Sequence, residues 1–167
     1  MLPKIRTILY CTSLGPHAPY VFGYAYTLAK GLKARIVALH VMESLSRKQA
    51  RLVEGYAGEG SLHELIKNAQ IDARRRLPGH MKEVLSAVSG EQDWERLVSE
   101  VIIAEGRSEK RILETVEARN ADLVVIGAHT ESSVLDRMIG HTARALVKNC
   151  PVPVLTVQVP SGFSETS

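Results

Sequence analysis

Short, nearly continuous apolar runs recur along this 167-residue chain, and they constrain its fold more than any other feature. The runs at 36–39 and 123–126 lack alternation of apolar and polar residues, so they suit strands buried on both faces. Between the runs, apolar residues recur three and four positions apart, as Phe22, Ala25 and Leu28 do, which is typical of amphipathic helices. This alternation predicts an α/β fold with an open five-stranded parallel sheet and helices on both faces.

The boundaries of the elements follow from breaker and capping residues. We expect strands at 5–12, 35–41, 97–104, 122–127 and 153–157, and helices at 19–32, 61–77, 81–88, 108–120 and 140–149. Pro78 and Gly79 are predicted to end or kink the helix before them, and Ser108 to act as an N-cap. The polar segment 43–60 carries three glycines and is predicted to be a variable, partly mobile connection.

Length and composition indicate one small globular domain. We assign residues 1–160 to it and expect the tail, 161–167, to be disordered. No apolar run approaches the roughly 20 residues of a membrane helix, and the N-terminus lacks a signal-peptide core, so we expect a cytoplasmic protein without membrane contact. Cys11 and Cys150 are expected to be reduced thiols, and the net charge of +3 gives too small a basic footprint for nucleic-acid binding.

The candidate binding residues follow the predicted strands. In open parallel sheets, ligands bind beyond the carboxyl ends of the strands, where the strand order reverses. The residues at these ends are Cys11, Thr12 and Ser13 at the end of the first strand, Val41 at the end of the second and Gly127 at the end of the fourth. Gly127 is equally compatible with a tight turn and with close approach of a ligand to the backbone.

The segment 121–157 resembles the C-terminal half of the universal stress protein family. Nucleotide-binding members of that family carry Gly, two residues, Gly, nine residues, Gly and then Ser or Thr, and Gly127 and Gly140 have this spacing. The runs at 8–13, 38–41 and 151–157 resemble the family's first two strands and its last strand. The resemblance is specific in the C-terminal quarter and absent from about 43–60. It implies a Rossmann-like fold of the adenine nucleotide alpha hydrolase type, with ATP or AMP, and Mg²⁺, as cofactors.

Three positions depart from the pattern of the nucleotide-binding members. Thr130 stands at the second motif glycine, His141 at the Ser or Thr after the last glycine, and Ser13 where those members carry an acidic residue. Threonine restricts a loop that requires a left-handed conformation, and serine replaces only part of the capacity of a carboxylate to bind ribose hydroxyls or a metal. The predicted helix start at Gly140, His141 and Thr142 still favours an anion, although helix initiation alone also explains these residues.

Two hypotheses for function follow. The first is a homodimeric universal stress protein that acts as a stress-response regulatory or binding module without efficient catalysis, through weak anion binding or contacts with unidentified client proteins. The second is an ATP or AMP sensor, or a slow ATP hydrolase, that uses the frame of Gly127 and Gly140. An adenylating enzyme is a remote third. The resemblance implies a dimer through the last strand, Val154 to Val157, unless the tail or a loop covers that edge.

Catalytic machinery is not evident in the sequence. Ser132 and Ser133 lack the flanking glycines of a nucleophile elbow, and Glu131 and Asp136 are not paired as acid and base. The histidines near the motif are better explained as loop and cap residues than as metal ligands. We therefore expect a binding module rather than an efficient enzyme.

Overall fold

The fold comes from a computed structural model, which describes residues 2–44, 47–58, 60–88, 94–128 and 139–160. The predicted tail at 161–167 and Thr130 lie outside these residues. The elements are therefore described within this part of the chain.

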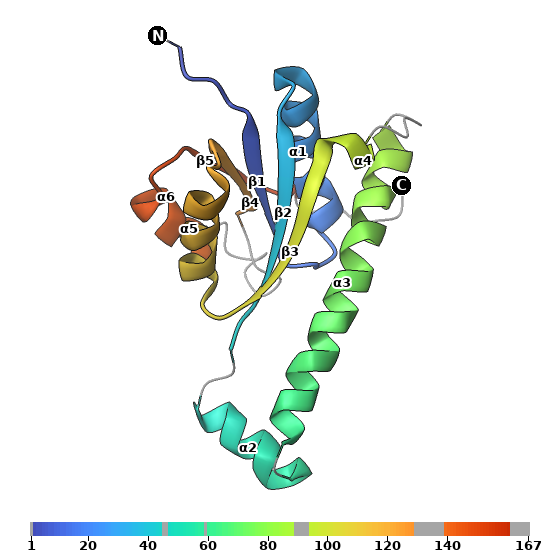
Figure 1. The fold of residues 1–167 in the computed structure, drawn as a ribbon, viewed down its shortest axis with the longest axis vertical. Coiled ribbons are helices and arrows are strands. Elements are labelled where there is room, and N and C mark those ends of the chain that lie inside the picture. The colour runs from blue at the N-terminus through green and yellow to red at the C-terminus, as the bar shows by residue number, and fades with distance from the viewer. Residues whose placement is uncertain (1, 45–46, 59, 89–93, 129–138, 161–167) are drawn as a thin grey trace.

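Five parallel strands form one sheet (Figure 1), as the sequence predicted. They are β1 (Thr7–Thr12), β2 (Arg35–Met42), β3 (Val98–Glu105), β4 (Leu123–Gly127) and β5 (Val154–Val157). Their order in the sheet is β3-β2-β1-β4-β5. All six residues of β1 are buried, because this strand lies in the middle of the sheet and both of its faces are covered.

Helices pack on both faces of the sheet, which confirms the predicted layers. They are α1 (Ala18–Leu32), α2 (Arg47–Ala57), α3 (Ser61–Val88), α4 (Trp94–Leu97), α5 (Ser108–Arg119) and α6 (His141–Asn149). Phe22 of α1 and Leu77 of α3 join Tyr10 of β1 in one core cluster. Leu146 of α6 joins Leu9 of β1 in a second cluster on the opposite face. No helix among the described residues is long and apolar enough to cross a membrane.

The segment 43–60, predicted as a variable, partly mobile connection, contains a helix that the sequence analysis did not predict. Residues 47–53 are mostly good helix formers, and they make up the larger part of α2. The glycines were given too much weight, because Gly58 and Gly60 serve only the turn after α2, where their φ angles are +92° and +85°. Gly55 is accommodated inside the helix.

Pro78 and Gly79 were predicted to end or kink the helix, and an end is wrong, because Pro78 lies inside α3, which is 28 residues long. Leu77 and Met81, on either side of the proline, are 0% and 1% exposed and belong to the core cluster beneath α3. Burial of two large side chains stabilises the helix by an amount comparable to the roughly 3 kcal/mol that an interior proline costs. The two helical pieces predicted at 61–77 and 81–88 are therefore one helix.

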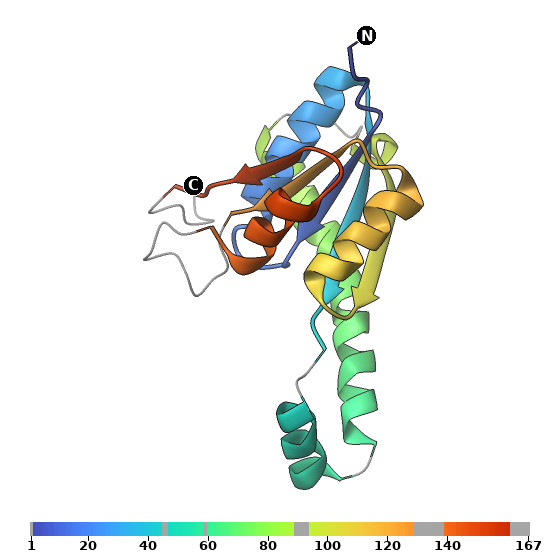
Figure 2. The same ribbon diagram turned by 90° about the vertical axis from the view of Figure 1, so that its left-hand side faces the viewer.

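Helix α2 packs against the N-terminal half of α3, and the two extend beyond the end of the sheet at which β2 ends (Figures 1 and 2). We call this pair of segments, residues 47–71, the arm. Its surface includes Tyr56, which is 91% exposed, and Leu52, which is 52% exposed. The C-terminal half of α3 packs on the sheet domain instead, through Leu77 and Met81.

Candidate ligand site at the carboxyl edge of the sheet

The strand order reverses between β1 and β4, because the chain adds β2 and β3 on one side of β1 and then β4 and β5 on the other. A cavity of about 300 Å³ opens at the carboxyl ends of these strands. We call it the inner hollow. Seven of the nine predicted site residues line it: Cys11, Thr12, Ser13, Val41, Gly127, Gly140 and Thr142. The structure therefore brings together residues that are far apart in the sequence, as the position of a topological switch point leads one to expect.

The inner hollow combines apolar walls with a few polar groups. Leu39, Ile112 and Ile126 line its walls, and these side chains belong to or pack against the second core cluster. Its polar groups include Ser13 and the ring of His40. Apolar walls with few polar groups are typical of small-molecule sites, and the volume lies at the small end of their range.

The turn after β1 forms one side of the inner hollow and is held by several hydrogen bonds. The hydroxyl of Thr12 accepts a bond from the N–H of Leu14 at 3.0 Å, and the ring Nδ1 of His40 lies 2.8 Å from the carbonyl oxygen of Thr12. Leu14 adopts a φ of +60°, and its carbonyl accepts a bond from Arg76 of α3 at 3.1 Å. The hydroxyl of Ser13 accepts a weaker bond from Gly15 at 3.3 Å. These bonds fix the turn before any ligand binds.

Cys11 has a structural role in this wall. Its side chain is buried, and burial raises the pKa of the thiol far above its usual range, with a smaller contribution from the charge of Cys150. Both cysteines are free. A thiol that stays protonated is a poor nucleophile, so Cys11 contributes apolar surface rather than reactivity.

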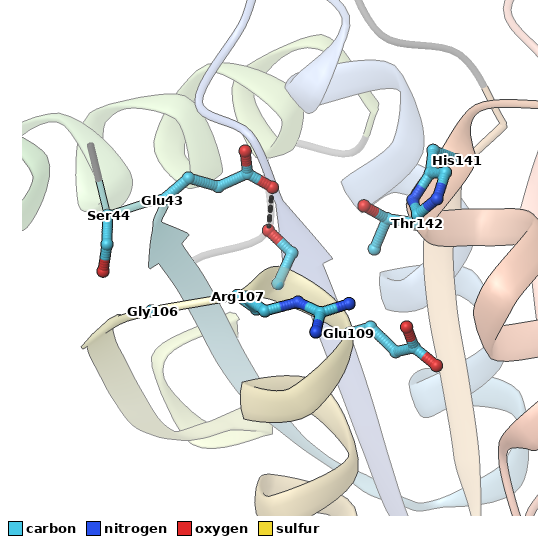
Figure 3. Close-up of a pocket in the computed structure, with 8 residues that line it drawn as sticks. Glu43, Ser44, Gly106, Arg107, Glu109, His141 and Thr142 are labelled. Carbon is cyan, nitrogen blue, oxygen red and sulfur yellow. Dashed lines mark hydrogen bonds between the residues drawn. The ribbon is translucent and has the colours of Figure 1, made fainter. Parts of the chain in front are cut away.

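A second cavity of about 270 Å³ adjoins the first, and we call it the outer hollow (Figure 3). Both hollows are lined by Glu43, Ser108 and Thr142. The outer hollow adds Ser44, Gly106, Arg107, Glu109 and His141, so the eighth predicted residue lies here and not in the inner hollow. The ninth, Thr130, lies outside the described residues.

The wall between the two hollows contains a residue that the sequence analysis assigned to another role. Ser108 was predicted as the N-cap of α5, but the N-cap is Arg107, and Ser108 is the first helical residue. The Ser108 hydroxyl instead donates to Oε1 of Glu43 at 3.0 Å, which connects the start of α5 with the end of β2. The prediction failed because the carboxylate that accepts from this hydroxyl lies 65 positions earlier in the sequence, where a local capping pattern does not reveal it.

Gly106, which precedes Arg107, has a conformation that requires glycine. Its φ is +136°, and a Cβ atom there would lie 2.9 Å from Nε of Arg111. Its N–H donates to the carbonyl of Met42 at 2.9 Å, so the ends of β2 and β3 are joined next to the outer hollow. Sequence reasoning missed Glu43, Arg107 and Glu109. Their positions after the second and third strands are the only signal that could have indicated them.

Helix α6 begins between the two hollows. Gly140 is its N-cap, with φ −57° and ψ 157°, and the Gly140 N–H donates to the carbonyl of Ala128 at 2.6 Å. The first turn, which contains His141 and Thr142, has no acidic residue and no side-chain cap. The free N–H groups and the positive end of the helix dipole therefore favour an anion here. Among the described residues, no group of three or more His, Cys, Asp or Glu side chains could hold a metal ion.

Comparisons with known proteins agree with this architecture. The model of the universal stress protein family matches residues 4–158. Universal stress protein MJ0577 of Methanocaldococcus jannaschii is 21% identical over 154 residues, which cover 92% of this chain and 94% of that protein. Universal stress protein Rv1996 of Mycobacterium tuberculosis is 30% identical over 149 residues, which cover 87% of this chain. The chain spans about half the length of this mycobacterial relative, 45% of which is aligned.

Solved structures share the fold. The structure of MJ0577 has a TM-score of 0.72 at 18% identity and covers 96% of this chain and 100% of its own. A universal stress protein in complex with cAMP has a TM-score of 0.56 at 19% identity and covers 93% of this chain and 98% of its own. At these identities the likeness concerns the fold alone. The family match over nearly the whole chain shows that this protein belongs to the universal stress protein family.

Proposed function

We propose that this universal stress protein is a regulatory module that binds an adenine nucleotide at the inner and outer hollows. The observation that carries the proposal is the start of α6, where an uncompensated helix N-terminus lies beside an apolar cavity at the switch point of the sheet. An apolar cavity suits a base, and a helix N-terminus suits a phosphate. The structurally similar protein in complex with cAMP supports a nucleotide as the ligand.

We further propose that the module binds its ligand without efficient turnover. Two carboxylates, Glu43 and Glu109, line the two hollows, and each already accepts a hydrogen bond, from Ser108 and from Asn149. General acid–base catalysis needs a group that is available to exchange a proton with the ligand, and these bonds engage both carboxylates. The buried thiol of Cys11 is protonated and is not a nucleophile. Residues 1–160 would form this one module, and its two free thiols fit a reducing compartment such as the cytoplasm.

Calorimetric titration tests the proposed function. Purified protein stripped of bound nucleotide is titrated with AMP, cAMP and ATP, with and without Mg²⁺, and each mixture is assayed for hydrolysis. We expect micromolar binding of at least one nucleotide and no multiple turnover. If none of them binds at millimolar concentration, the nucleotide proposal is wrong, and the function lies in contacts with client proteins. Rapid hydrolysis would contradict the proposal of a non-catalytic module.

We also propose a homodimer that forms through β5, which lies at one edge of the sheet. The carbonyls of Pro153 and Val157 accept hydrogen bonds from the β4 side. Because backbone groups alternate in direction along a strand, those of Val154 and Thr156 point outward from the sheet. An outward row of unpaired N–H and C=O groups is a template for another copy of the same strand.

Thr156→Pro is expected to convert the dimer to a monomer. Proline removes an outward N–H while the hydrogen bonds to β4 remain, so the edge strand tolerates it. Thr156→Val is the matched control, because it keeps the N–H and is expected to remain dimeric. Sedimentation velocity gives the oligomeric state, and circular dichroism verifies the fold. A folded Thr156→Pro protein that is still a dimer would place the interface elsewhere.

A further inference from the structure

The two hollows differ in the charge of their linings. The outer hollow contains the charged side chains of Glu43, Arg107 and Glu109, together with His141. The inner hollow has mainly apolar walls, and its one charged carboxylate, Glu43, lies where the two hollows meet. Figure 3 shows Arg107 and Glu109 on the α5 side of the outer hollow and His141 and Thr142 on the α6 side. A ligand that fills both hollows would therefore have an apolar end and a charged end.

Arg107 is the arginine of this hollow, and its side chain makes no polar interaction with the described part of the protein. Its guanidinium has no hydrogen-bond or ion-pair partner among the described residues, and its backbone is the N-cap of α5. Arg111, one turn further along α5, is engaged instead: it donates to the carbonyl of Glu105 at 2.6 Å and to Oε2 of Glu114 at 2.8 Å. The five N–H donors of Arg107 are thus available to a ligand.

The carboxylates of the outer hollow already have donors. Oε1 of Glu43 accepts from Ser108, and Oε1 of Glu109 accepts from the side-chain amide of Asn149 at 2.8 Å. Glu109 also lies in the first turn of α5, where its charge compensates that helix dipole. The first turn of α6 has no such residue. Both carboxylates keep their charge, so the attraction for an anion comes from Arg107 and the uncompensated start of α6 together. Beside Glu43 a hydroxyl-bearing part of the ligand is favoured.

We infer that the outer hollow is the subsite for the distal phosphates of the bound nucleotide and that Arg107 determines how many phosphates the protein prefers. The inference rests on the proposed function, because it assumes that the base and sugar occupy the inner hollow. A guanidinium binds phosphate oxygens through two parallel hydrogen bonds, which are stronger than bonds between neutral groups. The α-phosphate lies at the start of α6, and only the β- and γ-phosphates reach Arg107.

The test compares Arg107→Ala with wild-type protein in calorimetric titrations with adenosine, AMP, ADP and ATP. Wild-type affinity is expected to rise from AMP to ATP. In Arg107→Ala the affinity for ATP should fall on the order of 10- to 100-fold, the loss typical of a hydrogen bond to a charged group, while adenosine and AMP bind as before. Arg107→Lys keeps the charge without the planar fork and should give an intermediate loss.

Lys4→Ala is the matched control, because it removes one exposed positive charge before β1, at the opposite end of the sheet. This variant is expected to bind every ligand as wild type does. If wild-type protein binds none of the four ligands, the proposed function itself fails. If wild type and Arg107→Ala bind AMP and ATP with the same affinities, or if Arg107→Ala weakens adenosine and ATP equally, nucleotide binding stands and the role of Arg107 is overturned.

Discussion

Leu146→Ala is expected to lower the free energy of unfolding by about 2–5 kcal/mol, the range for removal of a buried leucine side chain. Leu146 is 0% exposed and lies in the core cluster between α6 and the sheet, with Leu9 and Val124. It attaches α6 to the sheet, and the start of this helix forms part of both hollows. The variant is therefore expected to lose nucleotide affinity as well as stability. Urea denaturation followed by circular dichroism measures the first effect.

Val147→Ala is the matched control for this prediction. Val147 follows Leu146 on the same helix but is 60% exposed, so its truncation leaves no cavity. Its free energy of unfolding is expected to stay within about 0.5 kcal/mol of wild type. Equal stability of the two variants would mean that α6 is not held by the buried cluster. Some contact other than that of Leu146 would then have to hold Gly140 and Thr142 at the hollows.

Gly140→Val is expected to weaken nucleotide binding by about 10- to 100-fold, which corresponds to the cost of crowding a well-fitted site. Gly140 lines the inner hollow at the start of α6, and a branched side chain there would take space from the ligand. Its φ of −57° and ψ of 157° are accessible to valine, so the chain should still fold. Titration with AMP and ATP measures the loss.

Gly31→Val controls for the general effect of placing valine at a glycine position. Gly31 lies in α1, and a Cβ atom there would meet nothing within 4 Å. Nucleotide binding by this variant should match that of wild type, and thermal melts should show all three proteins folded. A Gly140→Val protein that binds both nucleotides with wild-type affinity would remove the start of α6 from the ligand site.

The sheet was predictable because the physical signal is local. A central parallel strand must be apolar on both faces, and the runs in β1, β2 and β4 meet this requirement without reference to the rest of the chain. The ends of these strands then had to lie at one edge. For this reason the residues predicted at the carboxyl ends of β1, β2 and β4 line a single cavity.

The errors came from contacts that local patterns do not contain. Glycine and proline are reliable breakers only when tertiary packing does not oppose them, and the burial of Leu77 and Met81 keeps α3 continuous at Pro78. Glu43 was overlooked because it begins the segment treated as a variable connection. The bonds from Arg76 to Leu14 and from Ser108 to Glu43 join residues more than 60 positions apart. No spacing rule in the sequence indicates such pairs.

The arm is separate from the part of the chain that forms the sheet and lines the two hollows. Its outer part, α2 and the turn at Gly58 and Gly60, contributes no strand to the sheet and no lining residue to either hollow as described. Substitutions on the outer surface of this part are therefore expected to leave the strand register and the lining of both hollows unchanged, so contacts made by the arm can change independently of ligand binding.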